Sequence, residues 1–200
     1  MFEPNQAVDE CCYRFQPDSC SLDGAAEQEL SIHDGTVRDC MFLDDPRGNA
    51  VLVTAGAGDC RIHVTDTVTA TVIQSMAGHS NHVLSLCTWS AGNAMSKIVA
   101  PKDFIHTKLQ NSAGPVFASA SSDKTVRFWD LRARGCVNLV QYGTTSGGGS
   151  PVAAASVDPS GRLLATGHED ASCILYDVRG GRSVQSYKPH TADVRSVRFR

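Results

Sequence analysis

The sequence predicts an all-β fold built from repeated four-stranded antiparallel sheets. In three stretches, two aspartates stand seven residues apart with β-branched or aromatic residues alternating between them: Asp59 and Asp66, Asp123 and Asp130, Asp170 and Asp177. The alternation predicts a strand, and the first aspartate of each pair predicts the turn that precedes it. A histidine four residues ahead of a valine also recurs. The undisturbed repeat period is about 42 to 46 residues, which is typical of repeat proteins.

Composition and charge limit the possible classes of function. The chain has 200 residues, of which 42% are hydrophobic, and its formal net charge is −3, which fits one or two globular domains with a buried core. This balance provides no general basic field, so we expect neither nucleic acid nor a membrane surface as a partner. The N-terminal residues lack a signal-peptide pattern, and no apolar run reaches 18 residues. We therefore expect a cytoplasmic protein.

The cysteines are spread through the chain and include no Cys-x-x-Cys pair. Two of them, Cys60 and Cys173, fall inside expected strands, where they replace small apolar residues. This usage indicates buried free thiols in a reducing compartment, and favours neither a disulfide framework nor a zinc site. The eight cysteines are Cys11, Cys12, Cys20, Cys40, Cys60, Cys87, Cys136 and Cys173.

The first repeat unit is expected over residues 33–76. His33 stands four residues before Val37, which begins a strand, and Asp45-Pro-Arg-Gly48 has the composition of a β-turn with proline at its second position. Four short strands separated by turn signals predict an antiparallel meander. The three strands that follow the first are expected over residues 50–55, 60–65 and 69–76.

The second unit, over residues 79–141, repeats this pattern but is longer. Its leading histidine is His79, and the strand from Val83 to Trp89 follows. The leading histidine and the turn aspartate are 26 positions apart in the first unit but 44 apart in the second. The surplus lies in residues 91–115, which we interpret as an insertion between two paired strands, because long loops without structure of their own are uncommon in compact domains.

The third unit, over residues 148–187, has lost its leading histidine. The equivalent position lies in a glycine-rich loop at about Gly148, which we interpret as a flexible connection, since it lacks the Gly-Lys-Ser/Thr ending of a phosphate-binding loop. A further unit is expected to begin over residues 190–200. Residues 1–29 are polar and aperiodic, and we expect them to be an irregular segment that ends a preceding unit.

The Gly-His leader, the turn aspartate and the Trp-Asp strand ending resemble WD40 repeats, most clearly in the second unit. The resemblance covers residues 33–200 and implies a partial β-propeller of about three four-stranded blades, with a partial blade at each end. Three propeller blades leave two sheet faces uncovered, so we also expect the chain to be part of a larger propeller.

A sharper similarity points to WD40 proteins associated with neuronal microtubules. It rests on the stretches VTAGAGDCRIHVTD, TVRFWDLR and VDPSGRLLATGHEDASCILYDVRGGRSVQSY. It implies a non-enzymatic interaction scaffold in neuronal development, without a cofactor, a metal or a small-molecule substrate. Its expected partners are proteins associated with microtubule ends, or tubulin itself. The net charge gives no independent support for direct contact with the acidic tails of tubulin.

The WD40 resemblance implies a hydrogen-bonded chain in the second unit through His79, Ser119, Asp123 and Trp129. The other units have it only in part, with Ala55 and Thr65 expected at the serine and tryptophan positions of the first. We interpret the chain as structural, because its members recur where a turn needs to be held. The alternative is a catalytic relay through the histidine and the aspartate.

The remaining histidines have no spacing typical of a zinc site, so His63, His82, His106 and His168 are interpreted as surface or turn residues.

Five basic residues are candidate partner contacts. Arg132 and Arg179 each follow a strand-ending aspartate by two residues, which resembles the signature by which some propellers bind a cullin ubiquitin-ligase adaptor. A substrate receptor of such a ligase is therefore the alternative function; the simpler interpretation is that each arginine pairs with a neighbouring acid. Arg38, His82 and Arg195 flank the first valine of their strands and are expected near one rim of the propeller, where partners bind.

Overall fold

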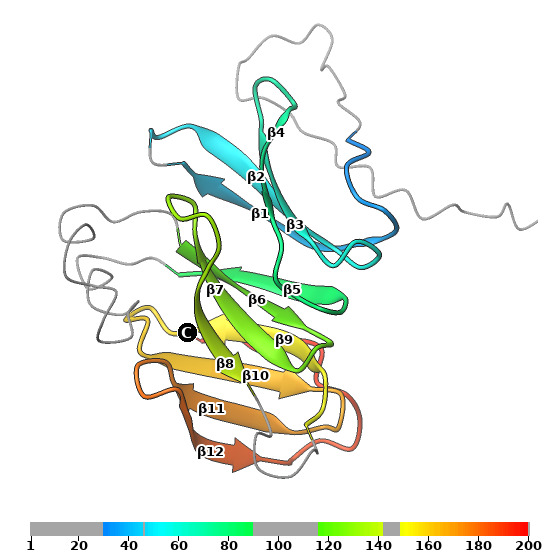
Figure 1. Cartoon of the computed structure of the whole chain (residues 1–200). Coiled ribbons are helices and arrows are strands. Elements are labelled where there is room, and N and C mark those ends of the chain that lie inside the picture. Colours follow the sequence, from blue (N-terminus) through cyan, green and yellow to red (C-terminus); the bar gives the residue numbers. More distant parts are fainter. Residues whose placement is uncertain (1–29, 46, 90–115, 142–148, 200) are drawn as a thin grey trace, which may run out of the picture.

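The computed structural model describes residues 30–45, 47–89, 116–141 and 149–199. It confirms the all-β prediction, because the described residues form strands and no helix (Figure 1). The predicted insertion at residues 91–115, the segment 1–29 and position 148 lie outside the described residues. The strands are β1 (Val37–Asp44), β2 (Ala50–Gly56), β3 (Ile62–Asp66), β4 (Val72–Met76), β5 (Val83–Thr88), β6 (Val116–Ser121), β7 (Thr125–Asp130), β8 (Cys136–Gln141), β9 (Val152–Val157), β10 (Leu163–His168), β11 (Cys173–Asp177) and β12 (Arg182–Tyr187).

The strands form three four-stranded antiparallel sheets in chain order, which we name blade 1 (β1 to β4), blade 2 (β5 to β8) and blade 3 (β9 to β12). The first strands of the blades are neighbours, since β1 packs beside β5 and β5 beside β9. One side chain links the first pair, because the backbone N–H of Leu86 donates to Asp39 Oδ2 at 2.6 Å. The arrangement is that of consecutive blades in a partial propeller (Figure 1).

Blade 2 is covered on both faces, and its strand β7 shows how. Successive side chains of a strand point to opposite faces. Phe128 joins a hydrophobic cluster with Ile174 and Tyr176 of blade 3, whereas Trp129 joins a cluster with Val53 and Ile62 of blade 1. Both aromatic side chains are fully buried. Two hydrophobic layers between neighbouring sheets therefore hold the three blades together.

Two strand starts in blade 1 come later than the sequence suggested. Cys60 has a φ of 53°, so it belongs to the turn, and β3 begins only at Ile62. Asp66 accepts hydrogen bonds from the backbone N–H groups of Val68 and Thr69, and this closes a turn that delays β4 until Val72. Both differences arise because an aspartate side chain binds the backbone two or three residues on and extends the turn.

The last described segment, residues 188–199, forms no strand and lies against β9 and the end of β10. Val194 donates its backbone N–H to the carbonyl of His168 at 3.0 Å, and Phe199 donates to Ser156 Oγ at 3.3 Å. Gly167 permits this close approach, since a Cβ there would lie 2.6 Å from a methyl carbon of Val194. This is the stretch in which the sequence predicted the start of a further blade.

The cysteine prediction needs one correction. Cys60 and Cys173 are only partly buried, because both stand at the edges of turns, and Cys87 in β5 is the buried thiol. Burial raises the pKa of Cys87 to about 12. All five described cysteines are free thiols. Among the described residues, no helix has the length and apolar character needed to cross a membrane.

Candidate functional site

A chain of hydrogen bonds connects four side chains across blade 2. His79 lies before β5, and its Nδ1 is 2.8 Å from Asp123 Oδ2 in the turn between β6 and β7. Its Nε2 is 2.7 Å from Ser119 Oγ in β6. Trp129 in β7 donates its Nε1–H to the same serine oxygen at 2.7 Å. The structure thus brings together all four residues that the WD40 resemblance suggested.

The protonation states in this chain follow from its acceptors. An ionised carboxylate only accepts, so His79 Nδ1 carries the proton, and neutral Nε2 accepts from the Ser119 hydroxyl. Asp123 also accepts from Thr125 Oγ1 at 2.6 Å and from the backbone N–H of Ser80 at 3.1 Å. Burial by itself raises the pKa of Asp123, but the hydrogen bonds from His79 and Thr125 outweigh it and hold the pKa well below its usual range.

The serine, histidine and aspartate have the connectivity of a hydrolytic triad. Whether they could act catalytically depends on whether a substrate can reach the serine hydroxyl. Ser119 is 0% exposed and His79 only 8% exposed, which leaves a substrate carbonyl no path to the hydroxyl. The Trp129 indole also donates to Ser119 Oγ and occupies a lone pair that a nucleophile would use. These contacts make the chain a structural connection between strands.

Blade 1 has a shorter version of this chain. His33 Nδ1 lies 2.9 Å from Asp59 Oδ2, and His33 Nε2 lies 2.8 Å from Thr54 Oγ1. The hydroxyl comes from Thr54 and not from the Ala55 position expected from the sequence, because the turn of blade 1 is one residue longer than that of blade 2. Gly58 accommodates the longer turn, since a Cβ there would lie 1.7 Å from the carbonyl oxygen of Asp34.

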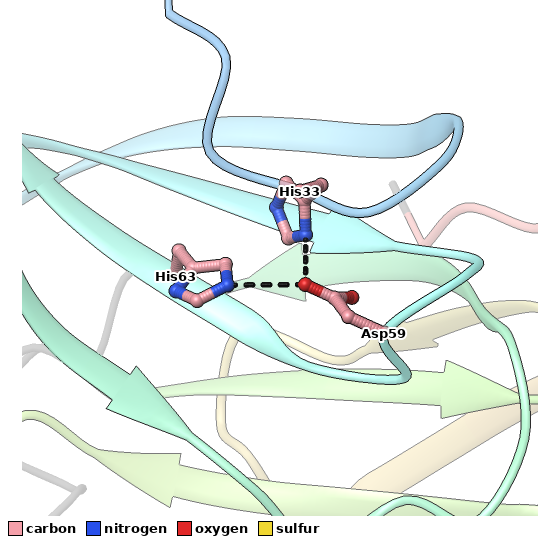
Figure 2. Close-up of side chains that lie close together, drawn as sticks. All are labelled: His33, Asp59 and His63. Carbon is pink, nitrogen blue, oxygen red and sulfur yellow. Dashed lines mark hydrogen bonds and ion pairs between the residues drawn. The ribbon is translucent and has the colours of Figure 1, made fainter.

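Blade 1 also contains a second imidazole, that of His63. The interpretation of His63 as a surface or turn residue is wrong, because it lies within β3 and its side chain is only 12% exposed. His63 in β3 is the register partner of Thr54, and its Nε2 lies 3.1 Å from the same Asp59 oxygen that faces His33 (Figure 2). The pattern of β3 placed His63 on a strand, but only the strand register places it beside His33. The tryptophan position is filled by Thr65, whose hydroxyl is buried without a hydrogen-bond partner among the described residues.

Burial and hydrogen bonding set the charges of this cluster. Burial lowers the pKa of His33, which favours its neutral form. Burial raises the pKa of Asp59, but the N–H of Arg61 and the two imidazoles outweigh it and lower the pKa overall, so the carboxylate stays ionised. The side chains of Asp59 and His63 are 14% and 12% exposed, while that of His33 is 1% exposed.

Blade 3 replaces the missing leading histidine with one from its own sheet. His168 at the end of β10 is fully buried, and its Nε2 lies 2.9 Å from Thr166 Oγ1. Its Nδ1 lies 3.3 Å from the carbonyl oxygen of Ser150. The interpretation of His168 as a surface or turn residue is therefore wrong, because it occupies the interior position that the leading histidine has in the other blades. Burial lowers its pKa.

The other repeated aspartates organise turns. Asp66 and Asp177 each accept a hydrogen bond from the backbone N–H two residues on, and Asp170 accepts from the backbone and the hydroxyl of Ser172. Asp130 is 5% exposed and pairs with a basic side chain, Arg132.

The candidate partner contacts have different surroundings. Arg132 forms a two-pronged ion pair with Asp130, through Nε at 2.9 Å and Nη2 at 2.7 Å. Arg179 is exposed, and its backbone N–H donates to Asp177. Arg38, His82 and Arg195 are also exposed, each next to the first valine of its repeat; Arg195 pairs with Asp193 at 2.6 Å.

A pocket of about 650 Å³ lies between the outer strand of blade 1 and the turn after β7 of blade 2. Arg132 and Arg134 line one side, and Gln74 lines the other and donates to the carbonyl of Ala133 at 3.1 Å. No pattern in the sequence indicated this pocket, because its walls come from two different repeats.

Replacing Ser119 with alanine is expected to lower the free energy of unfolding by about 2–4 kcal/mol, because the indole N–H of Trp129 and Nε2 of His79 each lose a buried partner. Urea denaturation followed by fluorescence measures the loss. The matched control is Ser186→Ala on the exposed strand β12, which we expect to change stability by less than about 0.5 kcal/mol. Equal effects of the two substitutions would contradict the structural role of Ser119.

Stability is expected to decrease as the pH falls below about 6.5, in part because of His168. The pKa of His168 is lower in the folded state than in the unfolded state, so the unfolded chain binds more protons. The contribution of this residue to stability is complete above its unfolded-state pKa and is lost as the pH falls through its folded-state pKa. Urea midpoints measured between neutral and mildly acidic pH should show this slope, and His168→Gln should reduce it. An unchanged slope in His168→Gln, matching the exposed control His82→Gln, would refute this explanation.

Sequence comparisons agree with this geometry. The family described as "WD domain, G-beta repeat" matches residues 70–130 and 140–177. Each match begins in or near the outer strand of one blade and continues through the first three strands of the next, so one sequence repeat links two neighbouring sheets.

Among similar curated proteins is a guanine nucleotide-binding protein subunit beta from Solanum tuberosum, 27% identical over 165 residues that cover 80% of this chain and 37% of the relative. Mitochondrial division protein 1 from Vanderwaltozyma polyspora is 27% identical, covering 80% of this chain and 29% of the relative. A CCR4-associated factor 4 homolog from Candida glabrata is 27% identical, covering 85% and 28%. The chain thus spans about a third of the length of these relatives. Its two matched stretches, its three four-stranded blades and its His-Ser-Asp-Trp chain make this chain similar to WD40 repeat proteins.

Proposed function

We propose that this protein is a non-enzymatic scaffold that binds other proteins through the rim formed by the starts of its innermost strands. The proposal rests on the difference between buried polar side chains that are hydrogen-bonded within the blades and exposed basic side chains. Inside blade 2, His79 binds Asp123 and Ser119, whereas Arg38 and His82 at the starts of β1 and β5, and Arg195 in the segment after β12, are exposed. Arginine at such positions is favoured as a binding hot spot.

The proposal extends to the cytoskeleton. The similarity to WD40 proteins of neuronal microtubules supports a cytoplasmic role at microtubules in neuronal development. We propose that a microtubule-associated partner protein bridges the scaffold to the filament, because a net charge of −3 gives no support for direct contact with the acidic tails of tubulin.

Co-sedimentation tests this proposal. The full chain is expected to remain in solution with microtubules made from purified tubulin, and to pellet with microtubules that retain their associated proteins. Arg38→Glu combined with Arg195→Glu should reduce the pelleted fraction several-fold by placing negative charge on the rim. The control Arg182→Glu lies on the exposed outer strand β12 and should pellet as the parent does. Failure to pellet in either preparation would refute the microtubule role, and an unaffected double variant would refute the rim.

The second hypothesis is a ubiquitin-ligase substrate receptor that binds its adaptor through Arg132 and Arg179. One of these two arginines already forms an ion pair within the protein. The Arg132 guanidinium is paired with Asp130, as in the simpler interpretation of this motif, while Arg179 extends from an exposed turn. If the protein is a receptor, Arg132→Ala combined with Arg179→Ala should abolish recovery of a cullin adaptor in a pull-down. Unchanged recovery, or no adaptor bound to the parent protein, would refute this hypothesis.

A further inference from the structure

We propose that His33, Asp59 and His63 form a binding site for a divalent transition-metal ion such as Zn²⁺ on blade 1. The three side chains come from the leader before β1, from the turn between β2 and β3, and from β3 (Figure 2). Their ligand atoms all lie within 4.8 Å of one another. Two imidazoles and one carboxylate are a donor set that suits zinc with one coordination position left for water.

The distances between the donors are close to those that zinc requires. His33 Nδ1 and His63 Nε2 lie 2.9 Å and 3.1 Å from Asp59 Oδ2. In a tetrahedral site with bonds of about 2.0–2.1 Å, neighbouring donors stand about 3.3–3.4 Å apart. Each nitrogen therefore needs to separate from the oxygen by only a few tenths of an ångström, while the two nitrogens, which lie within 4.8 Å of each other, need to reach the same spacing of about 3.3–3.4 Å.

The open side of the site is the side of Asp59 and His63. Gly56 lies directly against the cluster, since a Cβ there would lie 2.1 Å from Asp59 Oδ1 and 2.2 Å from His33 Nδ1. The exposed fractions of Asp59 and His63, 14% and 12%, give an ion and a coordinating water a route to these donors. His33 beneath them is 1% exposed and has a fixed orientation.

Metal binding requires a proton rearrangement on both imidazoles, without net loss of protons. The proton that His63 Nε2 donates to Asp59 moves to Nδ1, which has no hydrogen-bond partner among the described residues. Metal binding at His33 Nδ1 requires the proton of this neutral imidazole to move to Nε2, where Thr54 Oγ1 lies 2.8 Å away as an acceptor. The Thr54 hydroxyl then turns to the carbonyl oxygen of His63 at 3.5 Å. Such a hydrogen bond to the second ring nitrogen is typical of metal-bound histidine and orients its ring. Asp59 is already ionised.

Comparison among the blades shows that the second imidazole is not needed to hold the turn. In blade 2 the register partner of the hydroxyl residue is Arg127, and in blade 3 it is Ile174. The His79–Asp123 pair of blade 2 is satisfied without a second histidine. His63 is thus an additional ligand, and it stands in the blade where threonine has replaced the tryptophan of the structural chain.

Titration of the full chain with Co²⁺, which reports tetrahedral coordination by visible absorption, tests the site. We expect one bound ion per chain, visible d–d bands, displacement by Zn²⁺, and an increase in melting temperature with Zn²⁺. His63→Gln should weaken Co²⁺ binding by at least about tenfold. It should also preserve the circular dichroism spectrum, because the His33–Asp59 pair remains, as in blade 2.

Two control variants separate this site from other ligands. His82→Gln removes an exposed histidine outside the cluster, and Cys60→Ser removes the neighbouring thiol; both should bind Co²⁺ as the parent does. A thiolate-to-cobalt charge-transfer band would show that cysteine is a ligand and would overturn the proposal. So would equal binding by His63→Gln and the parent, or the absence of stoichiometric binding by the folded parent.

Discussion

The hydrogen bond between a leading histidine and a turn aspartate is the interaction on which each of the first two blades depends. It connects residues 44 positions apart in blade 2 and 26 apart in blade 1, so it fixes the start of the innermost strand to the turn between the second and third strands. A buried carboxylate is stable only when donors surround it. The imidazole therefore connects two segments of the blade and also supplies a hydrogen-bond donor that the buried aspartate requires.

The three blades place an imidazole beside a hydroxyl in their interior with different sets of side chains. Blade 2 uses the full set of histidine, serine, aspartate and tryptophan. Blade 1 has threonine in place of tryptophan and acquires a second imidazole on its carboxylate. Blade 3 takes its histidine from the strand itself, through His168 and Thr166. The position needs a ring nitrogen in the interior, and the backbone segment that supplies it can change.

Packing between the blades imposes a second constraint. Phe128 and Trp129 are neighbours in β7 but face different blades, so β6 and β7 do not show a simple alternation of buried and exposed residues. The polar groups that remain inside must be satisfied by each other, which explains why a Ser-His-Asp arrangement is buried where no substrate can reach it. The groups on which the proposals rest therefore lie at the exposed rim and in blade 1, where threonine takes the tryptophan position.

The sequence by itself determined the repeated strands, the aspartate turns and the residues of the blade 2 chain, because these depend on local alternation, turn chemistry and a fixed spacing. Tertiary structure alone decided that Thr54 serves as the hydroxyl of blade 1, that His168 lies inside, and that His63 shares a carboxylate with His33. One extra residue in a turn shifts the alignment between repeats, and strand register brings together residues that are distant in the chain. The alignment between repeats and the register between strands cannot be determined from positions along a single sequence, because both depend on how strands pair.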